Sequence, residues 1–244
     1  MSRILVWDLP TRLLHWLLVF SFAGAIGIAL SVDDDLPLFH VHMLLGLVAA
    51  LTVLLRLAWG LAGTRYARFG SFLFGPGALL TYLRGVFTRS DPRYVGHNPG
   101  AAYGIYAMLL LPLALAGSGL LLTTSDALDD LHPVLAYAML GVIGTHVAGL
   151  AWHWVRHREN LAIGMLTGRK DGDPAAAIPS ARPVVALLML MVVAGWAALL
   201  MTGHDATRAR VTLPGFTLPL GEPEDDGAPE GDHEGHDGDG DDDD

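Results

Sequence analysis

Five long apolar runs constrain the fold of this chain more than any other feature of its sequence. Each run has about the 17–25 residues that an α-helix needs to cross a bilayer. The runs are Leu13–Leu30, His42–Trp59, Ile105–Leu122, Val134–Trp154 and Pro183–Met201. Because 52% of the 244 residues are hydrophobic and only 16% are charged, we predict an all-α integral membrane protein.

The first run has a competing interpretation as a secretory signal, with Ala29, Leu30 and Ser31 as a loose cleavage site. The apolar region of a signal peptide is short, whereas this run is long, begins beside Trp16 and contains His15. We therefore interpret it as the first membrane span.

Charged residues alternate from loop to loop along the chain. Arg and Lys lie before the first span, between the second and third, and between the fourth and fifth, whereas the two other loops between spans carry Asp. Short loops rich in Lys and Arg stay on the cytoplasmic side of a membrane. We therefore predict a bacterial cytoplasmic (inner) membrane protein with its N-terminus in the cytoplasm and its C-terminus outside.

The same reading predicts how the chain is divided. Residues 1–170 are expected to form a four-helix membrane domain, 171–182 a cytoplasmic linker and 183–202 a fifth membrane helix. The segment 203–244 is expected to be an extracytoplasmic disordered tail, because its last 24 residues include 13 acidic side chains and no Lys or Arg. In the loop after the second span, a short interfacial helix is expected over Ala78–Phe87.

Four of the 11 histidines are placed to face the core of a helical bundle: His15, His42, His132 and His146. His146 follows His132 by 14 residues, which is about four helical turns and about 21 Å, so the two imidazoles share one face at different depths. In the predicted orientation, His42 and His132 lie at the outer level, and His15 and His146 at the inner level. Two imidazoles from facing helices form the axial ligands of a six-coordinate haem. The sequence therefore predicts two metal centres, with these four histidines as the metal ligands.

The absence of cysteine restricts the kind of centre. It excludes cysteine-ligated iron–sulfur clusters, blue copper and haem bound covalently through cysteine, so any haem here is held non-covalently. His40 competes with His42 as the outer ligand. We favour His42, because Gly46 lies one turn further along and leaves room for a flat macrocycle.

Other polar side chains are candidate cofactor-binding residues. Arg56 follows His42 by 14 residues, and an Arg at that level either binds a haem propionate or extends to the cytoplasmic surface. Arg12 has the same two interpretations. His97, at the start of the third span, hydrogen-bonds a propionate or a quinone, or caps the helix. His153 is interpreted as an interfacial group or as the wall of a quinone pocket, and not as an iron ligand.

These residues carry a resemblance to a known family. The segments VWDLPTRLLHW at 6–16, HMLLGLVAALTVLLRLAWG at 42–60, YVGHNPGA at 94–101 and ENLAIGMLTGRK at 159–170 are similar to the prokaryotic cytochrome b561 family. So is the spacing from His132 to His146. This family includes the b-type subunits of membrane-bound nickel–iron hydrogenases. The resemblance implies a four-helix, di-haem b electron carrier that exchanges electrons with the quinone pool, with the same four histidines as ligands.

The predicted function is therefore transmembrane electron transfer between ubiquinone or menaquinone and a redox partner. That partner is an extracytoplasmic cytochrome c or a dehydrogenase or hydrogenase subunit; membrane lipid is a further expected contact and nucleic acid is not. One alternative is a superoxide oxidase or another quinone-reducing oxidoreductase. A second is a metal transporter, which predicts carboxylates within the spans, and the five apolar runs contain none.

Overall fold

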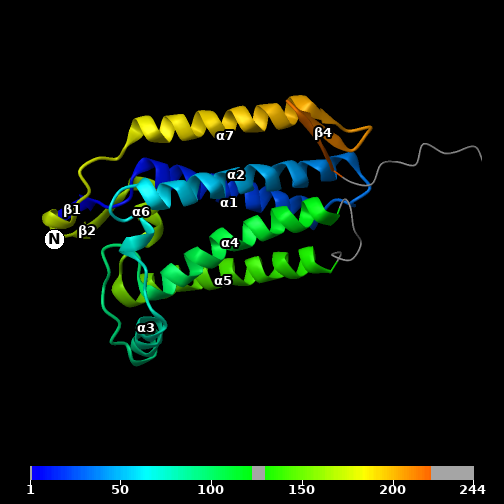
Figure 1. Ribbon diagram of the computed structural model, residues 1–244. Coiled ribbons are helices and arrows are strands. Elements are labelled where there is room, and N and C mark those ends of the chain that lie inside the picture. Colours follow the sequence, from blue (N-terminus) through cyan, green and yellow to red (C-terminus); the bar gives the residue numbers. More distant parts are fainter. Residues whose placement is uncertain (1, 123–129, 221–244) are drawn as a thin grey trace, which may run out of the picture.

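The computed structural model describes residues 2–122 and 130–220, and five long helices lie side by side within them (Figure 1). They are α1 (Leu9–Ala29), α2 (His40–Ala62), α4 (Pro99–Leu122), α5 (Leu131–His157) and α7 (Pro183–Gly203). Each is long and apolar enough to cross a membrane. The five predicted spans are confirmed, although α4 begins six residues before the predicted run.

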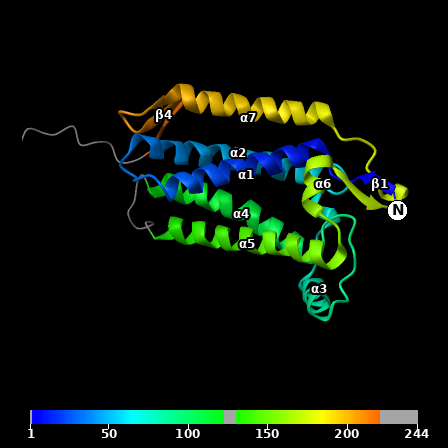
Figure 2. The same cartoon turned by 180° about the vertical axis from the view of Figure 1, so that it is seen from behind.

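The helices form three layers (Figures 1 and 2). The middle layer holds α1 and α2, the α4–α5 hairpin covers one side of it, and α7 covers the other. Trp196 of α7 donates a hydrogen bond from its indole nitrogen to the carbonyl oxygen of Leu47 in α2, over 3.2 Å. The predicted all-α membrane fold, with a four-helix bundle and one added helix, is confirmed.

A two-stranded antiparallel sheet joins the start of the chain to the segment after α5. It pairs β1 (Ser2–Leu5) with β2 (Arg169–Gly172). Gly168, just before β2, has a φ of 77°, and a Cβ atom there would lie 2.7 Å from the carbonyl oxygen of Trp7. Only glycine suits this close approach in a left-handed conformation. We call this end of the bundle, which also carries α6 (Leu161–Thr167), the β1–β2 end.

The segment 171–182 packs against the N-terminal part of the chain, whereas it was expected to be a linker. Its Ile178 is buried, and the backbone N–H of Ile178 donates to the carbonyl oxygen of Leu5 over 2.9 Å. The segment also contains a short 3-10 turn, η4 (Pro174–Ala176). Ile178 belongs to a core cluster with Ile4, Val6, Trp7 and Tyr66. The expected domain boundary at residue 170 therefore falls inside β2, because the N-terminal strand recruits this segment as its partner.

The expected disordered tail cannot begin at residue 203. The strands β3 (His204–Asp205), β4 (Arg210–Leu213) and β5 (Phe216–Pro219) form an antiparallel sheet in that order. Its buried face, Val211, Leu213 and Leu220, packs with Leu44 of α2 and Leu200 of α7. Alternating apolar residues in β4 give the sheet this face. We call the end of the bundle that carries this sheet the β3–β5 end. Residues 221–244, which carry the acidic run, lie outside the described residues.

The expected short helix is present as α3 (Pro76–Thr88), beside the β1–β2 end. Figure 1 shows α3 almost end-on while the spans are seen lengthwise, so α3 crosses their direction. Leu80 and Phe87 are exposed on it, Phe87 to 86%. An amphipathic helix in this orientation suits the surface plane of a membrane. Two further 3-10 turns, η1 (Pro37–Phe39) and η2 (Phe69–Ser71), adjoin α2 before and after it.

Candidate functional site

At the β3–β5 end, the structure brings His42 of α2 next to His132 of α5, with one ring edge-on to the other. Their ring centroids are 6.1 Å apart and the rings are inclined at 71°. An imidazole nitrogen binds a first-row metal at about 2 Å, and its ring centre lies roughly 1 Å further away, so two axial imidazoles have centres about 6 Å apart. The observed separation therefore has room for one metal ion between the two rings.

Hydrogen bonds fix which nitrogen each of these rings presents. Nδ1 of His42 lies 2.8 Å from the carbonyl oxygen of Ala25 in α1, and because a carbonyl only accepts, Nδ1 carries the proton. Nδ1 of His132 lies 3.0 Å from the hydroxyl of Ser118, which itself donates to the carbonyl oxygen of Leu115. Both rings thus leave the lone pair of Nε2 free, which is the arrangement that metal-binding histidines use.

Small residues line this outer pair. A Cβ atom on Gly119 would lie 3.4 Å from the ring of His132. A Cβ atom on Gly46, one turn after His42, would meet nothing within 4 Å among the described residues. The space expected beside Gly46 is therefore present.

His40, the competing outer candidate, has a different partner. Its Nδ1 lies 3.1 Å from Nε2 of His204, at the start of β3. This contact joins the beginning of α2 to the end of α7. The structure therefore favours His42 over His40 as the residue that meets His132.

The inner pair lies towards the β1–β2 end. His15 of α1 and His146 of α5 are within electrostatic range of each other, and both rings are partly exposed. The ring of Trp16 packs edge-on against that of His15, with 5.4 Å between centroids. The structure therefore places His15 and His146 near each other, and their assignment as a ligand pair stays a prediction.

Three buried polar atoms without a hydrogen-bond partner in the described part of the chain gather near the inner pair. They are Nη1 of Arg56, Nδ1 of His97 and the hydroxyl of Tyr106. Arg56 interacts electrostatically with both other residues, and His97 does so with His146. Three unpartnered groups that can all donate hydrogen bonds suit a bound carboxylate, since each costs free energy while it stays buried and unpaired.

Aromatic rings hold this pocket in place. His97 lies between Trp7 and Phe72, at 4.6 and 4.5 Å between ring centroids, and Phe72 also packs against Tyr106 at 5.7 Å. Burial, followed by the positive charge of Arg56, lowers the pKa of His97 to about 3, so its ring is neutral at physiological pH. His97 is not the helix cap, because the side chain of Asn98 accepts the N–H of Ala101 over 2.7 Å.

Arg56 is only 7% exposed and so does not extend to the surface. Its guanidinium lies 5.5 Å from the centre of the Phe69 ring and within electrostatic range of Asp8. Of its two interpretations, the structure favours the buried anion site. Tyr106, which completes the pocket, was not predicted, because a tyrosine in an apolar run carries no signal of its own.

Arg12 has a structural role instead. Its guanidinium donates to the carbonyl oxygens of Met165 and Leu166 in α6, the first over 3.2 Å. These bonds satisfy the exposed end of a helix and hold α6 against α1. They account for Arg12 without a propionate, so the expected cofactor contact has no support at this residue.

No group of three or more His, Cys, Asp or Glu able to hold a metal ion occurs among residues 2–122 and 130–220. Axial coordination of a haem needs only two histidines, and each pair has that number. The sequence profile of the family described as prokaryotic cytochrome b561 matches residues 6–168, more than half of the chain. The chain belongs to the prokaryotic cytochrome b561 family. No curated protein and no solved structure matches it.

Membership of the cytochrome b561 family makes this chain a multi-pass membrane cytochrome that binds haem b and transfers electrons. The matched segment includes all four spans of the bundle and the two histidine pairs. The added helix α7 and the sheet β3–β5 lie beyond it.

Proposed function

We propose that this cytochrome carries electrons across the membrane through two haem b groups, an outer one held by His42 and His132 and an inner one held by His15 and His146. The observation that carries the proposal is the outer pair. Its two Nδ1 atoms are engaged by Ala25 and Ser118, which leaves both Nε2 lone pairs available, and its centroids lie 6.1 Å apart, which supports a shared metal ion.

Haem would supply one-electron oxidation and reduction at each level. Two histidine ligands leave iron no open position, which suits electron transfer better than oxygen chemistry. At the inner level, Arg56, His97 and Tyr106 would bind a propionate and offset its negative charge in a site of low polarity.

The absorption spectrum of the purified protein tests this assignment. We expect a Soret band, a sharp α band on reduction, and two haems per chain by pyridine haemochrome quantitation. A protein that folds and lacks a Soret band would contradict the proposal, and one haem per chain would contradict its di-haem form.

We further propose that the β1–β2 end is cytoplasmic and that the C-terminus lies outside, on the strength of the alternating basic loops. Reporter fusions after Asp173, which leave β2 complete, and after Leu220 should then report opposite sides. We expect a cytoplasmic reporter to be active at the first site and an extracytoplasmic reporter at the second. The same side at both sites would mean that α7 does not cross the membrane.

We propose that electron exchange with ubiquinone or menaquinone occurs at the β1–β2 end, beside the inner pair. His153 supports this position, because it lies seven residues after His146 on nearly the same face of α5. The outer level at the β3–β5 end would then face the second redox partner, an extracytoplasmic cytochrome c or a dehydrogenase or hydrogenase subunit.

A further inference from the structure

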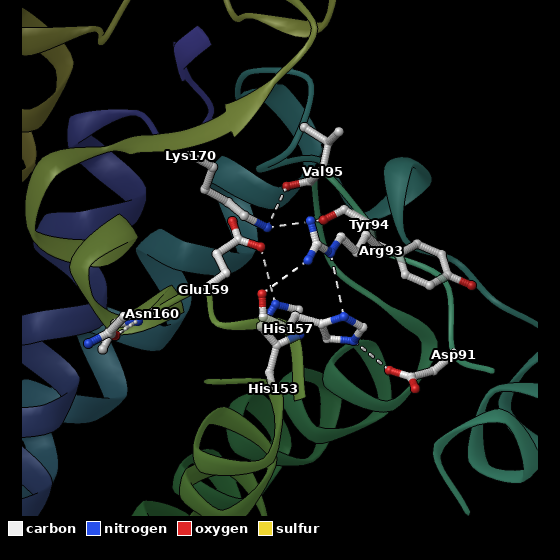
Figure 3. A network of polar contacts seen from close by, with 10 residues as sticks. Asp91, Arg93, Tyr94, Val95, His153, His157, Glu159, Asn160 and Lys170 are labelled. Atoms are coloured by element: carbon white, nitrogen blue, oxygen red, sulfur yellow. Dashed lines mark hydrogen bonds and ion pairs between the residues drawn. The ribbon is translucent and has the colours of Figure 1, made fainter. Parts of the chain in front are cut away.

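A carboxylate and an imidazole meet at the end of α5, outside both histidine pairs. Nε2 of His153 lies 3.2 Å from a carboxylate oxygen of Glu159. The side chain of Glu159 is 23% exposed and that of His153 is 12% exposed. Glu159 is therefore the member of the pair that is more open to solvent, and His153 is the more buried one. Figure 3 shows Glu159 reaching back towards His153, with Lys170 on its other side.

The backbone fixes this pair. Helix α5 ends at His157, and the next residue, Arg158, turns the chain back with a left-handed φ of 56°. The N–H of Arg158 donates to the carbonyl oxygen of Trp154 over 2.9 Å. Asn160 then starts α6 by accepting the N–H of Ala162. Glu159 therefore occupies a tight link between two helices and is held next to His153 by both of them.

The charged and titratable groups that face His153 are Glu159, His157 and Lys170. The ring of His157 is 4.5 Å from that of His153 between centroids. Lys170 is buried and donates to the carbonyl oxygens of Tyr94 and Val95, over 3.0 and 3.1 Å. Burial lowers the pKa of Lys170, while Glu159 raises it. Glu159 is thus the one carboxylate among these groups.

The neighbouring imidazole has a different environment. Nε2 of His157 lies 2.7 Å from a carboxylate oxygen of Asp91, and both side chains are almost fully buried. Arg93 donates to the carbonyl oxygen of His157 over 3.0 Å (Figure 3). These bonds clamp the loop before α4 to the end of α5. Because this pair is shielded from solvent, it offers no path for protons from solution. His157 is therefore a structural control for His153.

We propose that Glu159 and His153 relay protons between the cytoplasm and a quinone that exchanges electrons with the inner haem; this inference rests on the proposed function. Reduction of a quinone to a quinol takes two electrons and two protons. With each electron, a proton leaves the Glu159 carboxyl and binds Nε2 of His153, while the proton on Nδ1 of His153 passes to a quinone oxygen. Rotation of the imidazole then turns its protonated nitrogen towards the quinone and its bare nitrogen towards Glu159, so that the step can repeat for the second electron. Glu159 is reprotonated from solution, and quinol oxidation runs the same steps in reverse.

The relay is tested with the full-length cytochrome carrying both haems, reconstituted in lipid nanodiscs. The reduced protein is mixed with decylubiquinone in a stopped-flow instrument, and haem oxidation is followed from pH 6 to 9 in H2O and D2O. The variants are Glu159→Gln, Glu159→Asp, His153→Gln and the control His157→Gln. Haem content and the rate of haem reduction by dithionite are measured for each.

We expect Glu159→Gln and His153→Gln to slow oxidation by quinone about ten- to a hundredfold at high pH, in the range that positioned acid–base groups contribute. The loss should shrink as the pH falls, because free protons then replace the relay. Glu159→Asp should recover most of the rate, and His157→Gln should change the rate less than about twofold. Haem content and reduction by dithionite should match the unmodified protein.

Two outcomes overturn the relay, and they are distinguishable. If quinone oxidises the haems of the unmodified protein and Glu159→Gln shows the same rate, pH profile and isotope effect, the relay is wrong while the proposed function stands. If quinone does not oxidise the unmodified protein at all, quinone exchange is wrong and the relay falls with it.

Discussion

Replacing His132 with alanine is expected to remove one of two haems and leave the other. The reason is geometric: His132 pairs with His42 at one end of the bundle, and the other pair lies about 21 Å away along α5. His42→Ala should behave like His132→Ala, and His15→Ala like His146→Ala. Pyridine haemochrome quantitation should find one haem per chain in all four variants. The reduced absorption spectrum of the folded protein should be the same for the first two variants and different for the last two.

His40→Ala is the matched control for these variants. It removes an imidazole two residues from His42 and breaks the contact with His204, yet it should retain both haems. Folded yield must be measured in parallel, because loss of both haems in a collapsed protein carries no information on pairing. A crossed pattern, in which His42→Ala and His146→Ala lose the same haem, would show the pairing to be wrong.

The second large effect is expected at Asp8, which is 1% exposed. Its carboxylate accepts the backbone N–H of Thr11, the indole N–H of Trp59 and the hydroxyl of Thr64, and it faces Arg56. Asp8→Ala leaves these three donors without an acceptor and removes a negative charge near the buried guanidinium of Arg56. Because each buried donor left unpaired costs about 1–3 kcal/mol, a loss of about 3 kcal/mol or more of unfolding free energy is expected.

Thermal unfolding in detergent, followed by circular dichroism and by the Soret band, measures this loss. Asp8→Asn should lose less, because asparagine also caps a helix and can still accept two of the bonds. Asp173→Ala provides the control for the cap alone. Asp173 accepts the N–H of Ala175 over 2.9 Å but is exposed, so about 1 kcal/mol or less is expected. Equal stabilities of the Asp8 and Asp173 variants would contradict a buried hydrogen-bond network around Asp8.

The parts of the fold that follow from sequence are those governed by one-dimensional patterns. A membrane span depends on the length and polarity of a single run, so all five helices could be predicted from their apolar residues. The histidine levels follow in the same way, because 14 residues bring His146 back beneath His132 on one helix face. The relative positions of candidate ligands on a single helix can therefore be predicted from the sequence alone.

The parts that could not be predicted depend on residues far apart in the chain. The polar strand at 169–172 has no apolar alternation, and its partner lies at 2–5. Ser118 looks like any small residue of an apolar helix until His132 is placed next to it. Asp8 resembles an ordinary helix cap, and only the approach of Trp59 and Arg56 makes it the centre of a buried network.

The two histidine levels on α5 would also make this bundle sensitive to voltage, if each level holds a haem as proposed. With a haem at each level, an electron moving between them crosses about 21 Å of a hydrocarbon core of about 30 Å, and therefore about two thirds of the membrane potential. For every 100 mV felt between the levels, the ratio of outer to inner reduced haem shifts about fiftyfold. In the proposed orientation, an energised membrane, whose cytoplasmic side is negative, would hold electrons at the outer haem, and collapse of the potential would release them inward.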